Sequence, residues 1–116
     1  MLVAGASGRA RTHPTTLYRL HAGSLGDVIY ASGGLTSPQP RCLPNRKVKV
    51  LFNYGSGFVP VDVARSSDRG YFAGAGPSQN NGNPAQSIKF HLVKSTYTKH
   101  GHKQVCGGDT IAFPFP

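Results

Sequence analysis

The fold of this chain is decided by the stretch KVKVLFNY, residues 47–54. In a β-strand, alternate side chains share a face, so the apolar residues at the even positions lie on one side. Lys47, Lys49 and Asn53 lie on the other side. The stretch therefore predicts a strand with one face in a core and one basic face in solvent.

A second strand should pair with the first to form a hairpin. Residues 55–57 are Gly-Ser-Gly, and residues 58–63 then place valines at alternate positions, which is typical of a β-hairpin. Pro60 has no backbone N–H to donate to a neighbouring strand. We therefore expect the second strand to lie at a sheet edge or to carry a bulge at Pro60.

The rest of the chain favours strands over helices. Glutamate is absent, and the chain contains 15 Gly and 9 Pro, so no long window is composed of good helix formers. Strands joined by Gly- and Pro-rich turns are typical of an all-β fold. We expect a single antiparallel sandwich or partly open barrel, with further strands at residues 16–21, 27–31, 88–97, 104–106 and 109–113.

The segments around these strands read as connections and ends. We expect one β-rich domain over residues 16–113, preceded by a basic flexible arm at 1–15 and followed by an extended tail at 114–116. The Phe-Pro-Phe-Pro end should bury its rings in a neighbouring chain. Within the domain we expect a Pro-rich linker from Gly33-Gly34, a long mobile loop at 73–87 and a two-residue hairpin turn at Gly107-Gly108.

The charge of the chain indicates an anionic partner. Thirteen Lys and Arg stand against four Asp, which gives a formal net charge of +9. Such an excess favours association with polyanions. We expect a non-enzymatic structural or assembly protein that contacts nucleic acid or another polyanion, such as a virion shell component or a small ribonucleoprotein subunit, and that self-associates.

Basic residues next to aromatic ones favour nucleic-acid binding, because cations neutralise phosphates and aromatic rings stack on bases. The basic face of the strand at 47–54 and the basic segments beside it carry most of this signal. The predicted contact residues are Arg9, Arg11, Arg41, Arg46, Lys47, Lys49, Arg69 and Tyr71.

Other sites are less well supported by the sequence. His100, His102 and Cys106, with His91 or Asp109, are compatible zinc ligands, but their spacing matches no closed zinc finger. We predict no metal and no cofactor. No apolar run approaches the ~20 residues of a membrane span, so we expect a soluble protein without a membrane partner.

The two cysteines leave an alternative open. Cys42 and Cys106 are far apart in sequence, and we expect two separate buried thiols. A bridge between them would instead favour a secreted binding module, although the opening residues lack the basic and apolar regions of a signal peptide.

A further alternative comes from a local resemblance. Leu17-Tyr18-Arg19, Ile29 and Ser32-Gly33-Gly34-Leu35 resemble the first strand of the cholera-toxin-like mono-ADP-ribosyltransferases. The resemblance implies an NAD-binding domain in which Arg19 helps to hold the cofactor. That family also needs a catalytic glutamate, which this chain lacks, so the resemblance implies an inactive remnant.

Overall fold

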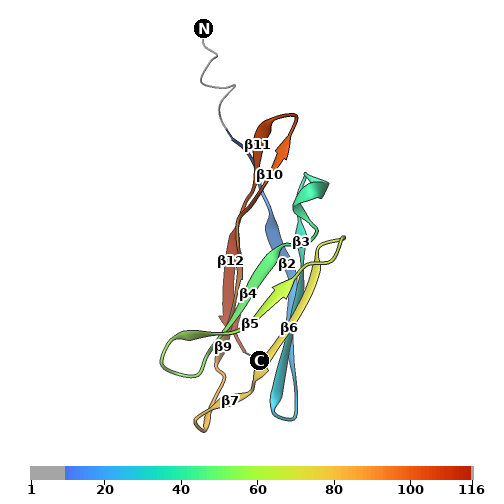
Figure 1. Ribbon diagram of the computed structural model, residues 1–116. Coiled ribbons are helices and arrows are strands. Elements are labelled where there is room, and N and C mark those ends of the chain that lie inside the picture. The colour runs from blue at the N-terminus through green and yellow to red at the C-terminus, as the bar shows by residue number, and fades with distance from the viewer. Residues whose placement is uncertain (1–9, 116) are drawn as a thin grey trace.

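The computed structural model describes residues 10–115 and confirms the all-β prediction. Its strands are joined by turns and by one short 3₁₀ helix (Figure 1). The elements are β1 (Arg11–His13), β2 (Thr16–Leu25), β3 (Val28–Thr36), η1 (Pro40–Cys42), β4 (Lys47–Asn53), β5 (Phe58–Arg65), β6 (Tyr71–Pro77), β7 (Gln79–Asn80), β8 (Asn83–Pro84), β9 (Ser87–Leu92), β10 (Ser95–Lys99), β11 (His102–Cys106) and β12 (Asp109–Pro114). None of the helical segments in this part of the chain could cross a membrane.

The largest sheet has four antiparallel strands in the order β12-β9-β4-β5. Val48, Val50 and Phe52 of β4 are fully buried, as the alternation of residues 47–54 predicts. β4 and β5 form the predicted hairpin. β5 is the last strand of this sheet, and the pairing shifts by one residue near Pro60, so both expectations for this proline are confirmed.

A second sheet, β2-β3-β6, shares its core with the first. Phe72 of β6 and Phe90 of β9 contact edge to face, with ring centroids 5.5 Å apart. Two aspartates connect neighbouring strands of the two sheets: Asp62 on β5 and Asp109 on β12. Their carboxylates accept hydrogen bonds of 2.9 Å from the backbone N–H groups of Ala75 and Leu17. None of the sheets in the described part is closed into a barrel.

A third sheet, β1-β11-β10, extends from the core to one end of the molecule (Figure 1). The molecule measures 62 × 27 × 17 Å, and its radius of gyration is 17.0 Å. A compact domain of this length would have a radius of about 13 Å. The protein is therefore elongated.

Two expectations for the connecting segments are wrong. Part of the expected arm, Arg11–His13, is β1 and pairs in parallel with β11. The expected loop at 73–87 contains the end of β6 and the small β7–β8 hairpin. Its residues are mostly Gly, Ala and polar, and backbone pairing with β3 holds 73–77 in a strand despite the small side chains.

The glycine pairs and the tail also differ from expectation. Gly33 and Gly34 lie inside β3 rather than opening a linker. Gly107-Gly108 is not a hairpin turn, because β11 pairs with β10 while β12 pairs with β9. Pro114 belongs to β12, which lies at a sheet edge, and Phe113 and Phe115 pack against the protein's own core.

The two cysteines form a disulfide, which corrects the expectation of separate thiols. Cys42 at the end of η1 and Cys106 at the end of β11 have Cα atoms 5.4 Å apart. The sulfurs are buried where the third sheet leaves the core. Only the tertiary structure brings together two residues that are 64 positions apart.

Candidate nucleic-acid interface

The outer face of the four-stranded sheet gathers five basic side chains. Lys47 and Lys49 come from β4, Lys89 and His91 from β9, and Arg65 from β5. We call this set the basic face. Lys47 lies directly opposite Arg65, and Lys49 lies directly opposite His91. Like charges opposite each other in a sheet reduce stability, so the Lys47–Arg65 pair costs free energy in the isolated protein.

The carboxylates of this sheet do not neutralise the basic face. Asp62 and Asp109 accept backbone hydrogen bonds at the strands that border the second sheet. Asp27 and Asp68 lie in the turns before β3 and before β6. None of the four aspartates therefore lies on the basic face.

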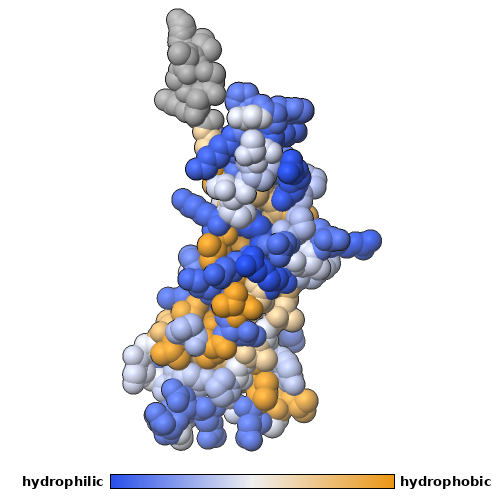
Figure 2. All heavy atoms as spheres, in the orientation of Figure 1, coloured by the Kyte–Doolittle hydropathy of each residue, from blue (hydrophilic) through white to orange (hydrophobic). Residues whose placement is uncertain are grey.

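Apolar groups lie among these cations. Lys89 Nζ lies 4.4 Å from the centroid of the Phe58 ring, and Val63, beside Lys49, is 51% exposed. The His91 ring nitrogen Nδ1 shares a 2.7 Å hydrogen bond with Thr110. Figure 2 shows hydrophobic side chains in the lower half of this view and mostly hydrophilic ones around the third sheet.

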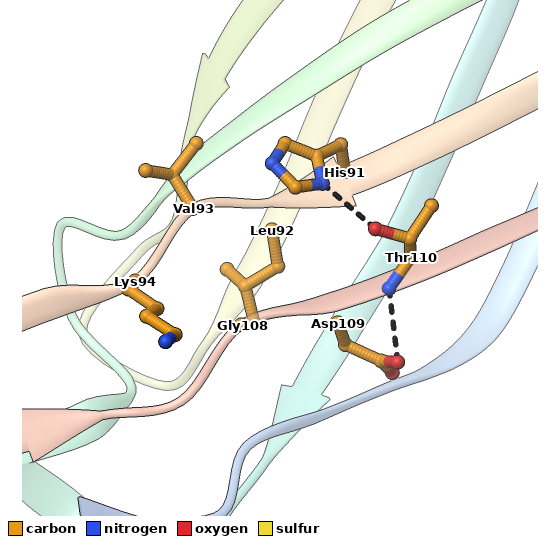
Figure 3. A pocket seen from close by; sticks show the side chains of 7 residues that line it. All are labelled: His91, Leu92, Val93, Lys94, Gly108, Asp109 and Thr110. Atoms are coloured by element: carbon orange, nitrogen blue, oxygen red, sulfur yellow. Dashed lines mark hydrogen bonds between the residues drawn. The ribbon is translucent and has the colours of Figure 1, made fainter.

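A shallow pocket of about 460 Å³ lies where β9 continues into β10 (Figure 3). Lys94 and His91 line it together with the β12 residues Asp109 and Thr110, and Asp109 also accepts a hydrogen bond from the Thr110 N–H. The pocket connects the basic face to the third sheet, where a second group of cations begins.

This second group is the turn between β10 and β11. Its basic side chains are all exposed: Lys99, His100, His102 and Lys103. We call residues 99–103 the basic hairpin. β1 adds Arg11, one of the predicted contact residues, to the same sheet, and its side chain is exposed. Positive charge therefore continues from the basic face to the end of the molecule.

Arg41, another predicted contact residue, lies beside this sheet. Its guanidinium lies 4.1 Å from the centroid of the Tyr97 ring, while His13 stacks on the same ring and bonds to Gln104 at 2.8 Å. Arg41 is exposed, so its charge can still reach a ligand.

Arg46 is not a surface residue, which corrects the prediction that it contacts nucleic acid. It is 2% exposed. Its guanidinium donates hydrogen bonds of 2.8–2.9 Å to the carbonyls of Cys42, Val93 and Gly107, and a longer one to Thr15. These groups belong to four separate segments that meet beside the disulfide, so Arg46 joins the third sheet to the core.

Burial lowers the pKa of Arg46, because desolvation disfavours the charged form. A guanidinium nevertheless remains protonated in proteins. Its charge is balanced by carbonyl dipoles, since the groups that it bonds carry no formal charge. Arg46 therefore serves the fold.

The remaining predicted residues are dispersed. Arg69 lies in the turn before β6, and Tyr71 lies at the start of β6, half exposed on the other sheet. Arg9 lies outside the described residues. Arg19, which the family resemblance associates with NAD, is exposed in a bulge of β2.

Sequence reasoning missed Lys89, His91 and Arg65. The alternation of residues 88–92 places Lys89 and His91 on the solvent face of a strand, which was a usable signal. Their position beside Lys49 depends on pairing between β4 and β9, which the sequence does not reveal.

Cys106 cannot act as a thiolate ligand because it is in the disulfide, and residues 10–115 contain no cluster of three potential metal ligands.

Comparisons of the chain with protein families, with characterised proteins and with solved structures give no match. The functional argument therefore depends on the geometry described above.

Proposed function

We propose that this chain is a non-enzymatic structural or assembly protein that binds nucleic acid through its basic face. The observation that carries the proposal is the gathering of Lys47, Lys49, Lys89 and Arg65 on one sheet surface, with Lys47 directly opposite Arg65. Repulsion between these groups is relieved when phosphates lie between them. A polyanion therefore gains more from this face than from scattered surface cations.

The proposed ligand is single-stranded. Lys47, Lys49 and Lys89 would contact phosphates, and the Phe58 ring would offer a stacking surface for a base once Lys89 turns from the ring to a phosphate. The basic hairpin and Arg11 would extend contact along the 62 Å length of the molecule. We also propose that the four-stranded sheet and the β2-β3-β6 sheet form a sandwich. Their shared core and the contacts of Asp62 and Asp109 support this arrangement.

Titration of a labelled 20-nucleotide RNA at several salt concentrations tests the proposal. For single strands, the slope of log K against log salt is about −0.7 per phosphate contact. The double variant Lys49→Ala/Lys89→Ala should lose about 1.4 from the magnitude of this slope and should bind more weakly at every salt concentration.

A matched control removes the same charge elsewhere. Arg19→Gln/Arg69→Gln lowers the net charge equally at two exposed residues and leaves the basic face and the basic hairpin intact. If both double variants lose affinity equally, the ligand senses only the total charge, and the proposed site is wrong. Equal binding of heparin and RNA would indicate a general polyanion-binding protein.

Assembly is part of the proposal. β1 and β10 are the outer strands of the third sheet, so each offers one unpaired edge to another chain. Sedimentation before and after nuclease treatment distinguishes two forms. A shell component should sediment as large particles, whereas a ribonucleoprotein subunit should return to a small species when its RNA is digested.

The disulfide favours a second candidate, a secreted binding module, because such bridges persist in oxidising compartments. Mass spectrometry of protein isolated from its native source, alkylated before reduction, tests this candidate. A chain that retains the bridge supports it, and a chain with two alkylated thiols contradicts it.

A further inference from the structure

The outer face of the other large sheet has a very different composition. Strands β2, β3 and β6 contain a single Lys or Arg, Arg19, and no Asp. Three of the five tyrosines of the chain, Tyr18, Tyr30 and Tyr71, lie on the outer side of these strands by their register. We call this surface the tyrosine face.

Small residues separate the tyrosine rings. Tyr18, Gly34 and Tyr71 lie in one row across the three strands. The Tyr18 ring lies against the backbone of Gly34, where an added Cβ would be only 2.7 Å from the ring atom Cε1. Glycine at this position therefore allows the ring to rest on the sheet.

The third ring lies farther along the sheet. Tyr30 is four residues from Gly34 on β3, which corresponds to about 13 Å along a strand. Ser32 and Ala73 occupy the row between. Tyr30 and Tyr71 are 51% and 50% exposed, so about half of the surface of each residue is open to a ligand.

Polar groups accompany the rings. Ser32 and His21 are opposite each other in the row between Tyr18 and Tyr30, and His21 is exposed. Arg19 lies with its guanidinium carbon 5.5 Å from the Tyr18 ring centroid. The face thus combines flat apolar rings with hydrogen-bonding groups and very little charge.

We propose that the tyrosine face binds a neutral oligosaccharide. One side of a pyranose ring presents C–H groups that pack on an aromatic ring, and its hydroxyls bond to groups such as those of Ser32, His21 and the tyrosines. Two exposed rings separated by one row of small residues suit an extended chain of several sugars. This site is independent of the proposed basic face.

The near absence of charge on the tyrosine face favours a neutral ligand over a nucleic acid or a second copy of the chain. A nucleic acid of similar length needs several cations for its phosphates, and these three strands supply only Arg19. A second copy of the chain, docked face to face, would bring a second Arg19 and no acidic partner for either arginine, because these strands contain no Asp. A neutral polyol needs no cations from the face and brings no charge that would be left without a partner.

Intrinsic tyrosine fluorescence provides the test, because the chain has no tryptophan. The full chain is titrated with cellohexaose, maltohexaose and chitohexaose at low and at high salt. At least one oligosaccharide should change the emission with saturation, and its Kd should change less than twofold between the two salt concentrations.

Three variants locate the site. Tyr30→Ala and Tyr71→Ala should each weaken binding about tenfold, which corresponds to about 1.4 kcal/mol for the loss of one stacking contact. Tyr30→Phe keeps the ring and should retain binding within about threefold, since the hydroxyl contributes only a modest hydrogen bond. Lys49→Ala/Lys89→Ala should leave saccharide binding unchanged.

Several results would overturn the proposal. These are no binding to any of the three saccharides, loss of binding at high salt, or unchanged affinity of Tyr30→Ala with an unaltered melting temperature. Sedimentation equilibrium addresses the other occupant: a dimer that Tyr30→Ala dissociates would assign the face to a second copy of this chain.

Discussion

The two outer faces of this molecule differ in charge although the sheets that carry them share one core. Strands β4, β5, β9 and β12 contain four Lys or Arg, whereas β2, β3 and β6 contain one. Burial of the inner faces stabilises both sheets in the same way. The outer faces are therefore free to differ, and we infer that they serve different ligands.

The comparison is clearest where the same residue type occurs both in the core and on a face. Arg46 directly precedes β4, and Arg65 on β5 lies opposite the first residue of β4. Arg46 is nevertheless buried, whereas Arg65 is exposed. Tyr54 is in the core, whereas Tyr30 is on a face. The predictions below test whether each member of these pairs acts as its location indicates.

The largest effect is expected for Arg46→Ala. The carbonyls of Cys42, Val93 and Gly107 would lose their donor, and the unfolding free energy should fall by about 5 kcal/mol. Urea denaturation measures the loss. The surface variant Arg65→Ala is the control and should change stability by less than about 0.5 kcal/mol. Comparable losses in the two variants would remove the distinction between buried and exposed cations.

Removal of the disulfide should have the next largest effect. Closure of a loop of this length stabilises the native state by about 4 kcal/mol in the chain-entropy account. Cys42→Ser/Cys106→Ser should therefore be less stable by about this amount in the same urea experiment. Because the bridge holds the third sheet, hydrogen exchange of β10 and β11 should accelerate more than that of β4. Uniform acceleration would contradict this localised role.

The buried position of Tyr54 should be visible in its pKa. Burial raises the pKa of Tyr54, and its hydroxyl donates to the Pro77 carbonyl. A pKa that is raised in the folded state adds stability that is complete below the unfolded value of about 10 and is lost as the pH rises through the folded value.

Tyr54→Phe tests this difference. The variant should lose about 1 kcal/mol near neutral pH through the missing hydrogen bond, and its stability should decline less steeply above pH ~10. Ultraviolet titration should show that a phenol of raised pKa in the native protein is absent from the variant. A variant that keeps this late ionisation step would contradict the assignment.

The smallest effect concerns the basic face itself. Lys47→Thr removes the like-charge pair with Arg65 and should stabilise the protein by about 0.5 kcal/mol while weakening RNA binding. On the tyrosine face, Tyr30→Thr should leave stability within about 0.5 kcal/mol and RNA binding unchanged. A destabilised Lys47→Thr would mean that the pair is not repulsive in the free protein.

Much of the local structure was predictable from the sequence. The alternation in residues 47–54 identified β4 and its buried face, and Pro60 indicated an edge and a bulge. The candidate site was only half predictable. Lys47 and Lys49 were found because they belong to the clearest strand, whereas Lys89 was missed because its place depends on a partner strand about 40 residues away.

The errors share a physical origin. Gly107-Gly108 looks like a hairpin turn, but β11 and β12 pair with different strands. Residues 73–77 look like a loop because their side chains are small, but the hydrogen bonds of a strand come from the backbone. Composition and local turn patterns do not report backbone pairing between distant segments.

By itself, the sequence determined that the chain forms strands, which side of β4 is buried, and that a large positive charge remains, because alternation and net charge are properties of neighbouring residues or of the whole composition. Only the tertiary structure decided that Arg46 is internal, that Cys42 meets Cys106 and that cations and tyrosines occupy separate faces. These outcomes depend on the register between strands, and a shift of one residue would reverse every side chain on a strand.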